Sequence, residues 1–286
     1  MSYKIITDTC CDYPAQMYQE LGLEVVALEV LYKGAGHKNY TEQWLQDFYD
    51  GLRHGETATT SAVNPEGWAN VIEPVLQEGK DALVLPFSSG LSGTYQSAVI
   101  AAEELMEKYP QRKIRVVDTL SASLGQGLFV WYACKKRDEG LSLEELALWC
   151  EENRLKLCHW FTVDDLMYLK RGGRVSAATA LVGTMLGIKP VLHVDKEGHL
   201  INVAKARGRK ASIEALVNKM AETGTPGAND TVFICHGDCE EDAKYLANRV
   251  KEKFGVKEVL YYYTGAVIGS HSGPGTLALF FLGEHR

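Results

Sequence analysis

ALVLPFSSGLSGTYQSA, residues 82–98, is the stretch from which the fold of this chain can be predicted. Residues 82–87 form a short, nearly unbroken apolar run, which is typical of a strand buried on both faces of a parallel sheet. Residues 88–94 then supply small hydroxyls and two glycines, and Tyr95 begins a pattern typical of an amphipathic helix. Backbone N–H groups and the positive end of the helix dipole converge at such a turn, so it can bind an anion. An ordinary helix cap explains a Ser-Gly turn equally well.

The composition is that of an ordinary globular protein. The 286 residues are 46% hydrophobic and 23% charged, and this length favours about two domains. The net charge of -7 and the lack of a Lys/Arg block argue against nucleic acid as a partner. No signal pattern opens the chain, and its apolar runs are far shorter than the roughly 20 residues of a membrane span. We therefore expect a cytoplasmic protein without a membrane span.

The seven cysteines are odd in number and lie mostly in apolar segments, which indicates reduced, partly buried thiols. Only Cys235 and Cys239, with His236 and Asp238, form a cluster that resembles a metal site. No second ligand pair of suitable spacing accompanies it, so we expect no metal.

The first half of the chain alternates between predicted strands and helices. The strands are predicted at residues 3–7, 23–32, 82–87 and 114–117, and the helices up to residue 21 and at 41–52, 65–78, 95–108 and 122–137. This alternation favours a mostly parallel sheet with helices on both faces.

The second half differs in pattern. It has predicted strands at residues 157–163, 189–194, 200–204, 231–235 and 258–263 and predicted helices at 209–222 and 239–254. Residues 195–198 are a hairpin turn, which predicts an antiparallel pair. We therefore predict an α/β protein of two domains with a ligand between them: residues 1–155 with a mostly parallel sheet, and 156–286 with a mixed or antiparallel sheet.

Two polar segments of the first half are candidates for the same site. Asp8 and Asp12 follow the first strand, at the sheet edge where open α/β sheets bind ligands, although turn and cap roles also fit them. Residues 57–65 are rich in hydroxyls. Helix capping explains Asn64 and Pro65, but it does not explain the hydroxyls at positions 59–61. We predict a loop there that approaches residues 88–94, because a short crossover returns the chain to the same edge.

The second half contributes a basic turn and a histidine. Residues 169–174, LKRGGR, place Arg171 and Arg174 around a Gly-Gly turn, an arrangement suited to a carboxylate or phosphate or simply to a solvated turn. Residues 269–276, GSHSGPGT, are predicted as a loop between two apolar strands. His271 in that loop is suited to donating to an anion or to transferring a proton.

Ser92, His271 and Asp8 together raise the alternative of a serine hydrolase. Ser92 lies in GLSGT, which lacks the second glycine of the G-x-S-x-G elbow. The phosphate-binding patterns G-x-x-x-x-G-K-[ST] and G-x-G-x-x-G are also missing at the expected places, so the sequence does not predict nucleotide chemistry.

The motifs occur in an order that resembles the DegV family of lipid-binding proteins, which includes FakB, the fatty-acid-binding subunit of bacterial fatty acid kinase. They are Asp8-x-x-x-Asp12, Thr60-Ser61, residues 88–95, residues 169–174 and His271-x-Gly273-Pro274-Gly275. The resemblance spans essentially the whole chain.

The resemblance implies a protein that buries a long-chain fatty acid in a tunnel. It implies that Thr60 and Ser92 hold the carboxylate, with Ser61, the Gly93 amide and His271 nearby and with Arg171 and Arg174 near the head group or the partner surface. In FakB-like members a separate ATP-binding subunit, FakA, phosphorylates the bound acid to an acyl phosphate. This chain would then be a carrier with no catalytic residue and no cofactor beyond its fatty acid.

The chain departs from the family pattern at two places. Thr9, Cys10 and Cys11 stand where members often have serines, and Ala-Val-Asn-Pro follows Ser61 where many have Gln-Pro. The alternatives are an acyl hydrolase or transferase using Ser92 and His271, and a protein that binds a non-lipid anion. The aromatic residues at 160–161 and 261–263 are predicted as strand and core residues rather than tunnel walls.

Overall fold

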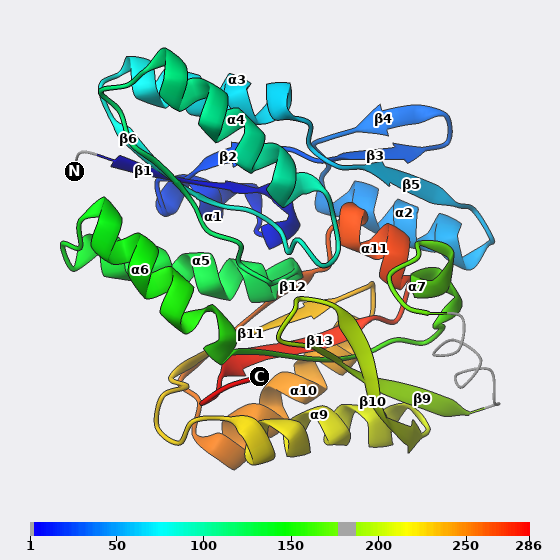
Figure 1. The fold of residues 1–286 in the computed structure, drawn as a ribbon. Helices are drawn as coiled ribbons and strands as arrows, with labels where there is room; N and C mark the ends of the chain where they lie inside the picture. Colours follow the sequence, from blue (N-terminus) through cyan, green and yellow to red (C-terminus); the bar gives the residue numbers. More distant parts are fainter. Residues whose placement is uncertain (1–2, 177–186) are drawn as a thin grey trace.

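The computed structural model describes residues 3–176 and 187–286, which form three sheets with helices packed around them (Figure 1). The first sheet has four parallel strands in the order β2-β1-β6-β7. They are β1 (Tyr3–Asp8), β2 (Glu24–Val26), β6 (Asp81–Leu85) and β7 (Ile114–Val116). α1 (Ala15–Glu20), α3 (Pro65–Gln77), α4 (Thr94–Lys108) and α6 (Leu143–Asn153) are helices of this half.

Strand β6 is buried on both faces, as its apolar run predicts. Leu83 and Leu85 belong to one hydrophobic cluster with α6, whereas Ala82 and Val84 belong to another with α3 and α4. Successive side chains of a strand point to opposite faces, so one short segment joins two helical layers.

The second sheet has six strands in the order β10-β9-β8-β13-β11-β12. They are β8 (Leu157–Thr162), β9 (Ile188–Val194), β10 (Leu200–Arg207), β11 (Thr231–His236), β12 (Glu258–Tyr263) and β13 (Leu277–Leu282). Strands β11 and β12 are parallel, and the other neighbouring pairs are antiparallel, including the predicted β9–β10 hairpin. Helices α9 (Arg209–Thr223) and α10 (Glu240–Phe254) pack against this sheet.

Helix α5 (Ser123–Asp138) lies between the two large sheets (Figure 1). Its first eight residues are all buried, which is expected of a helix enclosed on every side. Leu124 and Leu128 share one hydrophobic cluster with Leu83 of the first sheet and Phe233 of the second. The two halves of the chain therefore have a common core around α5.

A third, small sheet contains two segments that were predicted differently from the sequence. Residues 23–32 are divided between β2 and β3 (Glu29–Tyr32), and residues 58–61 form a strand, β5 (Ala58–Ser61), instead of a loop. With β4 (Ala35–His37) they make the antiparallel order β4-β3-β5, beside helix α2 (Glu42–Arg53). The run Ala-Thr-Thr-Ser has the β-branched content of a strand, and pairing with β3 extends it.

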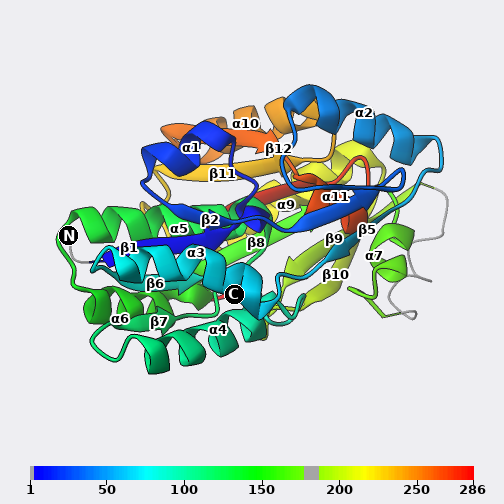
Figure 2. The same cartoon turned by 90° about the horizontal axis from the view of Figure 1, so that it is seen from above.

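Residues 269–276 also differ from the prediction. Helix α11 (Ala266–Ser272) contains the first four of them, and only the residues that follow form a loop. Packing against α2, α7 (Met167–Arg171), β3 and β5 stabilises this short helix despite its glycine and serines. Both cartoon views show α11 beside α7 (Figure 2).

The observed architecture confirms the predicted fold class, an α/β protein with a parallel sheet in its first half and a mixed sheet in its second. The division into domains at residue 155 stays a prediction. Within the described ranges, no helix has both the length and the apolar character needed to cross a membrane.

Candidate functional site

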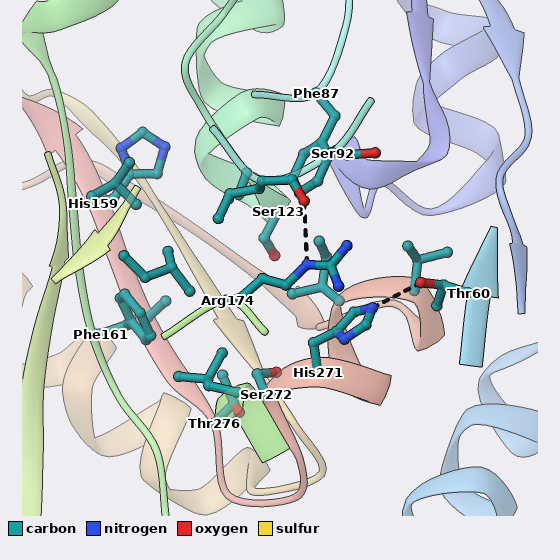
Figure 3. A pocket seen from close by; sticks show the side chains of 18 of the residues that line it. Thr60, Phe87, Ser92, Ser123, His159, Phe161, Arg174, His271, Ser272 and Thr276 are labelled. Carbon is teal, nitrogen blue, oxygen red and sulfur yellow. Dashed lines mark hydrogen bonds between the residues drawn. The ribbon is translucent and has the colours of Figure 1, made fainter. Parts of the chain in front are cut away.

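A cavity lies between the first half of the chain and the second sheet (Figure 3). Its polar lining includes Thr60, Ser61, Ser92, Gly93, Arg174 and His271. Its apolar lining includes Leu28, Phe87, Leu91, Phe161, Leu169, Val194, Leu200, Val267, Ile268, Ala278 and Phe280. Every residue predicted to hold a head group therefore lines this cavity, except Arg171.

The polar and apolar parts of the cavity differ in depth. Ser61 and Gly93 are exposed, and Thr60, Ser92 and His271 are half-buried. In contrast, Ala278 and Phe280 on β13 are almost fully buried. The predicted head-group residues thus lie near the surface. The deeper lining is mostly apolar, with the buried side chains of Ser123, His159, Ser272 and Thr276 as its polar part.

The turn between β6 and α4 positions Ser92 and Gly93. The Ser92 hydroxyl lies 2.8 Å from the Thr94 hydroxyl and accepts a hydrogen bond from the Thr94 backbone N–H at 3.2 Å. The first amides of a helix have no partners within it, so this end of α4 can receive a negative group.

The predicted approach of residues 57–65 to this turn is confirmed. The Val63 backbone N–H donates to the Thr94 hydroxyl at 3.3 Å, and the Trp68 indole donates to the Thr94 carbonyl at 3.0 Å. These bonds hold β5, which carries Thr60, beside the turn that carries Ser92.

His271 reaches the cavity from α11. Its Nε2 atom lies 2.7 Å from the Thr60 hydroxyl. Burial and the nearby Arg174 guanidinium lower the pKa of His271 to about 4, so the imidazole is neutral at pH 7. Gly172 lies directly against its ring, because a Cβ at position 172 would overlap Nδ1 of His271.

The two arginines of the basic turn have different environments. Arg174 is half-buried in the cavity, donates to the Leu91 carbonyl at 3.2 Å and donates to the Gly172 carbonyl (Figure 3). Arg171 is exposed, and its guanidinium lies 4.5 Å from the centre of the Tyr168 ring. The sequence alone could not distinguish them, whereas the structure places only Arg174 in the cavity.

The aromatic residues also separate into two groups. Trp160 lies in the core of the second sheet, and Tyr261 to Tyr263 lie in β12, as predicted. Phe161 is a buried residue of β8, as predicted, and in addition it lines the cavity. Neighbouring residues of a strand face opposite sides of the sheet, which explains why Trp160 and Phe161 differ.

Asp8 and Asp12 lie beneath the site rather than in its lining. Asp8 accepts hydrogen bonds from the Cys10 and Phe87 backbone N–H groups at 2.9 and 2.7 Å, so it caps a short 3-10 helix, η1 (Thr9–Cys11), and holds the end of β6. Asp12 accepts from the Ser123 hydroxyl. Burial raises the pKa of Asp8 to about 6 and that of Asp12 to about 7.

Ser92 and His271 do not form a nucleophile–base pair. The Ser92 hydroxyl is engaged by Thr94, and the His271 ring is engaged by Thr60. With a pKa of about 4, His271 is also a weak base. This geometry does not favour the hydrolase alternative.

The two cysteines that were considered as metal ligands have other contacts in the structure. The Cys235 Sγ atom lies 3.2 Å from the Ser123 hydroxyl oxygen, and Cys239 accepts from Arg209 at 3.3 Å. Burial raises the pKa of each thiol to about 12, which disfavours the thiolate that a metal requires.

Comparisons with known proteins agree on one family. Residues 2–284 match the model of the DegV family, which is described as uncharacterised. A DegV domain-containing protein of Clostridium perfringens is 45% identical over 286 residues, which are 99% of this chain and 98% of that protein.

Two solved structures share the fold. A DegV family protein from Thermus thermophilus, described by its fatty acid binding, has a TM-score of 0.88 at 35% identity and covers 99% of this chain and 100% of its own. The B3 protein of Streptococcus pneumoniae fatty acid kinase, loaded with linoleic acid, has a TM-score of 0.85 and covers 99% of this chain and 100% of its own. Its identity of 22% shows a common fold alone.

Proposed function

The chain belongs to the DegV family, and on that premise we propose that it binds a long-chain fatty acid in the cavity. The carboxylate lies at the polar end and the acyl chain extends into the apolar end. Fatty acid binding by the Thermus thermophilus relative supports this proposal.

The observation that carries the proposal is that the exposed and half-buried polar residues Thr60, Ser61, Ser92, Gly93, Arg174 and His271 line a cavity whose deeper lining is mostly apolar. Each buried methylene contributes about 0.8 kcal/mol, so ten of them contribute roughly 8 kcal/mol before the costs of binding. The affinity therefore comes mainly from the chain, while the polar end determines which end of the ligand faces the surface.

The polar end suits a carboxylate. Thr60, Ser92 and the Gly93 amide supply uncharged donors, and the half-buried Arg174 supplies a positive charge. No aspartate or glutamate is among the lining residues that the structure describes. A carboxylate buried without such donors would be costly, so these groups make the bound orientation favourable.

We further propose that a separate kinase subunit phosphorylates the bound carboxylate to an acyl phosphate, with this chain as the carrier. The surface position of Ser61 and Gly93 supports access to the head group, and the exposed Arg171 offers a cation to an acidic partner. The test is incubation of the loaded protein with ATP. We expect acyl phosphate only when a FakA-like subunit is added, and its formation without that subunit would contradict the carrier role.

The direct test of fatty acid binding is native mass spectrometry of the purified protein, followed by extraction of the bound molecule. We expect one long-chain fatty acid per chain. An empty protein that takes up no fatty acid on incubation would contradict the proposal.

The double variant Thr60→Val, Ser92→Ala tests the head-group assignment. Because two hydrogen bonds to a charged group are lost, we expect affinity for stearic acid to fall by roughly 100-fold or more. The measurement is a fluorescence displacement titration. Thr59→Val with Ser89→Ala is the matched control, since neither residue lines the cavity, and equal affinities of the two double variants would refute the assignment.

Gly172→Ala tests the position of His271. Gly172 has a φ of -73°, so alanine fits the backbone, but its Cβ would displace the imidazole. We expect affinity for stearic acid to fall roughly tenfold with little change in folding. Gly173→Ala is the control, because Gly173 has a φ of +73° and open space around it: stability should fall there while affinity is retained.

A further inference from the structure

Thr94, the first residue of α4, contacts the Ser92 hydroxyl that the proposed function assigns to the head group. The Thr94 side chain is completely buried and is not among the described residues that line the cavity. Ser92 is half-buried and does line it. A hydroxyl donates a single hydrogen bond, so the direction of the Thr94 proton decides what the Ser92 hydroxyl can offer to a ligand.

The direction of the Thr94 proton follows from its two partners. The Val63 backbone N–H lies 3.3 Å from Oγ1 of Thr94 and can only donate, so Oγ1 accepts from it. The second partner is Oγ of Ser92 at 2.8 Å. No other atom of the described residues accepts from the Thr94 hydroxyl, and solvent does not reach this side chain. A buried hydroxyl proton without an acceptor is costly, so Thr94 donates to Ser92.

The Ser92 hydroxyl is thereby left with a free proton. Its Oγ atom accepts from the hydroxyl of Thr94 at 2.8 Å and from the Thr94 backbone N–H at 3.2 Å. These two bonds occupy both lone pairs of the Ser92 oxygen, so the hydroxyl can only donate. Its proton has no acceptor among the described residues, and a carboxylate oxygen of the ligand is such an acceptor.

Resting on the proposed function, we infer that Thr94 is a positioning residue: its buried hydroxyl fixes Ser92 as a hydrogen-bond donor to the carboxylate of the fatty acid. Hydrogen bonds in series polarise one another, so the bond from Thr94 also strengthens the bond from Ser92. The same hydroxyl holds the backbone of Val63, just after β5, so a test has to separate its effect on Ser92 from its effect on β5.

A double-variant cycle makes this separation. The affinity for stearic acid is measured by displacement titration for the wild type, Thr94→Val, Ser92→Ala and the double variant. We expect Thr94→Val to weaken binding about 3- to 10-fold when Ser92 is present, because Ser92 loses its fixed orientation and its polarisation. In the Ser92→Ala background the same change should cost less than about twofold, since no hydroxyl remains to be oriented. Equal losses in both backgrounds would overturn the inference.

Two further variants control for the loss of a buried hydroxyl. Thr94→Ser keeps the hydroxyl and should restore the affinity to within about twofold of the wild type. Thr119→Val is the matched control, because Thr119 is also fully buried, donates to the Pro86 carbonyl at 2.7 Å and accepts from the Ser121 N–H at 3.2 Å. Thr119 is not among the described residues that line the cavity, so its replacement should leave the affinity unchanged. A loss in Thr94→Ser or Thr119→Val as large as that in Thr94→Val would contradict the role of the Thr94 hydroxyl.

Neutron diffraction tests the proton directions in the unmodified protein, so it does not depend on the folding of a variant. Crystals with bound stearic acid are exchanged into heavy water. We expect the deuterium of Thr94 to point at Oγ of Ser92 and the deuterium of Ser92 to point at the carboxylate. A Ser92 deuterium directed at Thr94 would refute the inference.

The outcomes separate the two proposals. If the wild type binds stearic acid but the cycle shows equal losses or the deuterium positions are reversed, only the role of Thr94 fails. If the wild type does not bind stearic acid, the proposed function fails and the role of Thr94 fails with it.

Discussion

Replacing Arg286 by alanine is expected to lower the free energy of unfolding by on the order of 3 kcal/mol. The guanidinium of this residue donates to the carbonyls of Leu120, Arg154, Leu157 and Asp195 and to the Ser121 hydroxyl. These acceptors belong to three segments: the loop after β7, the stretch from η2 (Arg154–Lys156) to the first residue of β8, and the turn between β9 and β10. Burial lowers the pKa of Arg286 to about 10, and none of these five acceptors is a carboxylate. Its loss removes a donor from four carbonyls, of which those of Leu157 and Asp195 keep a hydrogen bond from His159 and Gly198.

The measurement is urea unfolding of wild type and Arg286→Ala at pH 7. Arg249→Ala is the matched control, since Arg249 pairs with both carboxylate oxygens of Glu214 at 2.7 and 3.1 Å but lies at the surface. Surface ion pairs contribute little, so the control should shift the midpoint only slightly. A shift for Arg286→Ala no greater than that of the control would show that the acceptors are satisfied without it.

The elements that could be predicted best are those whose sequence pattern lies within a few neighbouring residues. Strand β6 and the turn after it could be predicted because an apolar run, hydroxyls and a helix pattern follow one another within residues 82–98. The β9–β10 hairpin was equally clear from the turn at residues 195–198. Helix α6 was not predicted, although Ser142 and Glu145 form a capping box that could have revealed it.

The elements that the sequence did not reveal depend on partners far along the chain. Strand β5 exists through pairing with β3, and α11 exists through packing on α7 and α2. In the β3–β4 connection, Lys33 and Gly34 both have positive φ, as a tight hairpin turn requires, and only Gly34 is a residue type that predicts such a turn.

The same contrast between local patterns and distant contacts holds for the site residues. Thr60, Ser92 and His271 could be named from motifs, but only the fold brings them together from β5, the β6–α4 turn and α11. The choice of Arg174 over Arg171 depends on how the turn at Gly172 and Gly173 folds back on the cavity. His159, which also lines the cavity, was not named from the sequence because it lies inside the apolar strand β8, where a lone histidine carries no pattern.

The pH dependence of stability combines two opposing groups of side chains. Burial lowers the pKa of four histidines, namely His159, His193, His236 and His271. The unfolded chain binds more protons at these positions below about pH 6.5, so they destabilise the fold as the pH falls. Asp8 and Asp12 act in the opposite sense, because their raised pKa values mean that the folded state holds protons that the unfolded state releases. A variant is therefore needed to isolate the carboxylates.

Asp12→Asn is expected to stabilise the protein relative to wild type by an amount that grows as the pH rises from about 4 to about 7 and then stays constant. A rise in the pKa of Asp12 from 3.8 to about 7 corresponds to on the order of 4 kcal/mol of unfavourable charge burial at pH 8, which we take as an upper bound. Asparagine keeps the shape and an oxygen that accepts from the Ser123 hydroxyl, but it carries no charge to bury.

Urea unfolding of both proteins between pH 4.5 and 8 measures the difference in stability. The histidine contributions cancel in this difference because both proteins contain them. Asp47→Asn, at an exposed position, is the control for the substitution itself. A flat difference for Asp12→Asn would show that Asp12 is charged in the folded protein throughout this range, with its charge compensated by the groups around it.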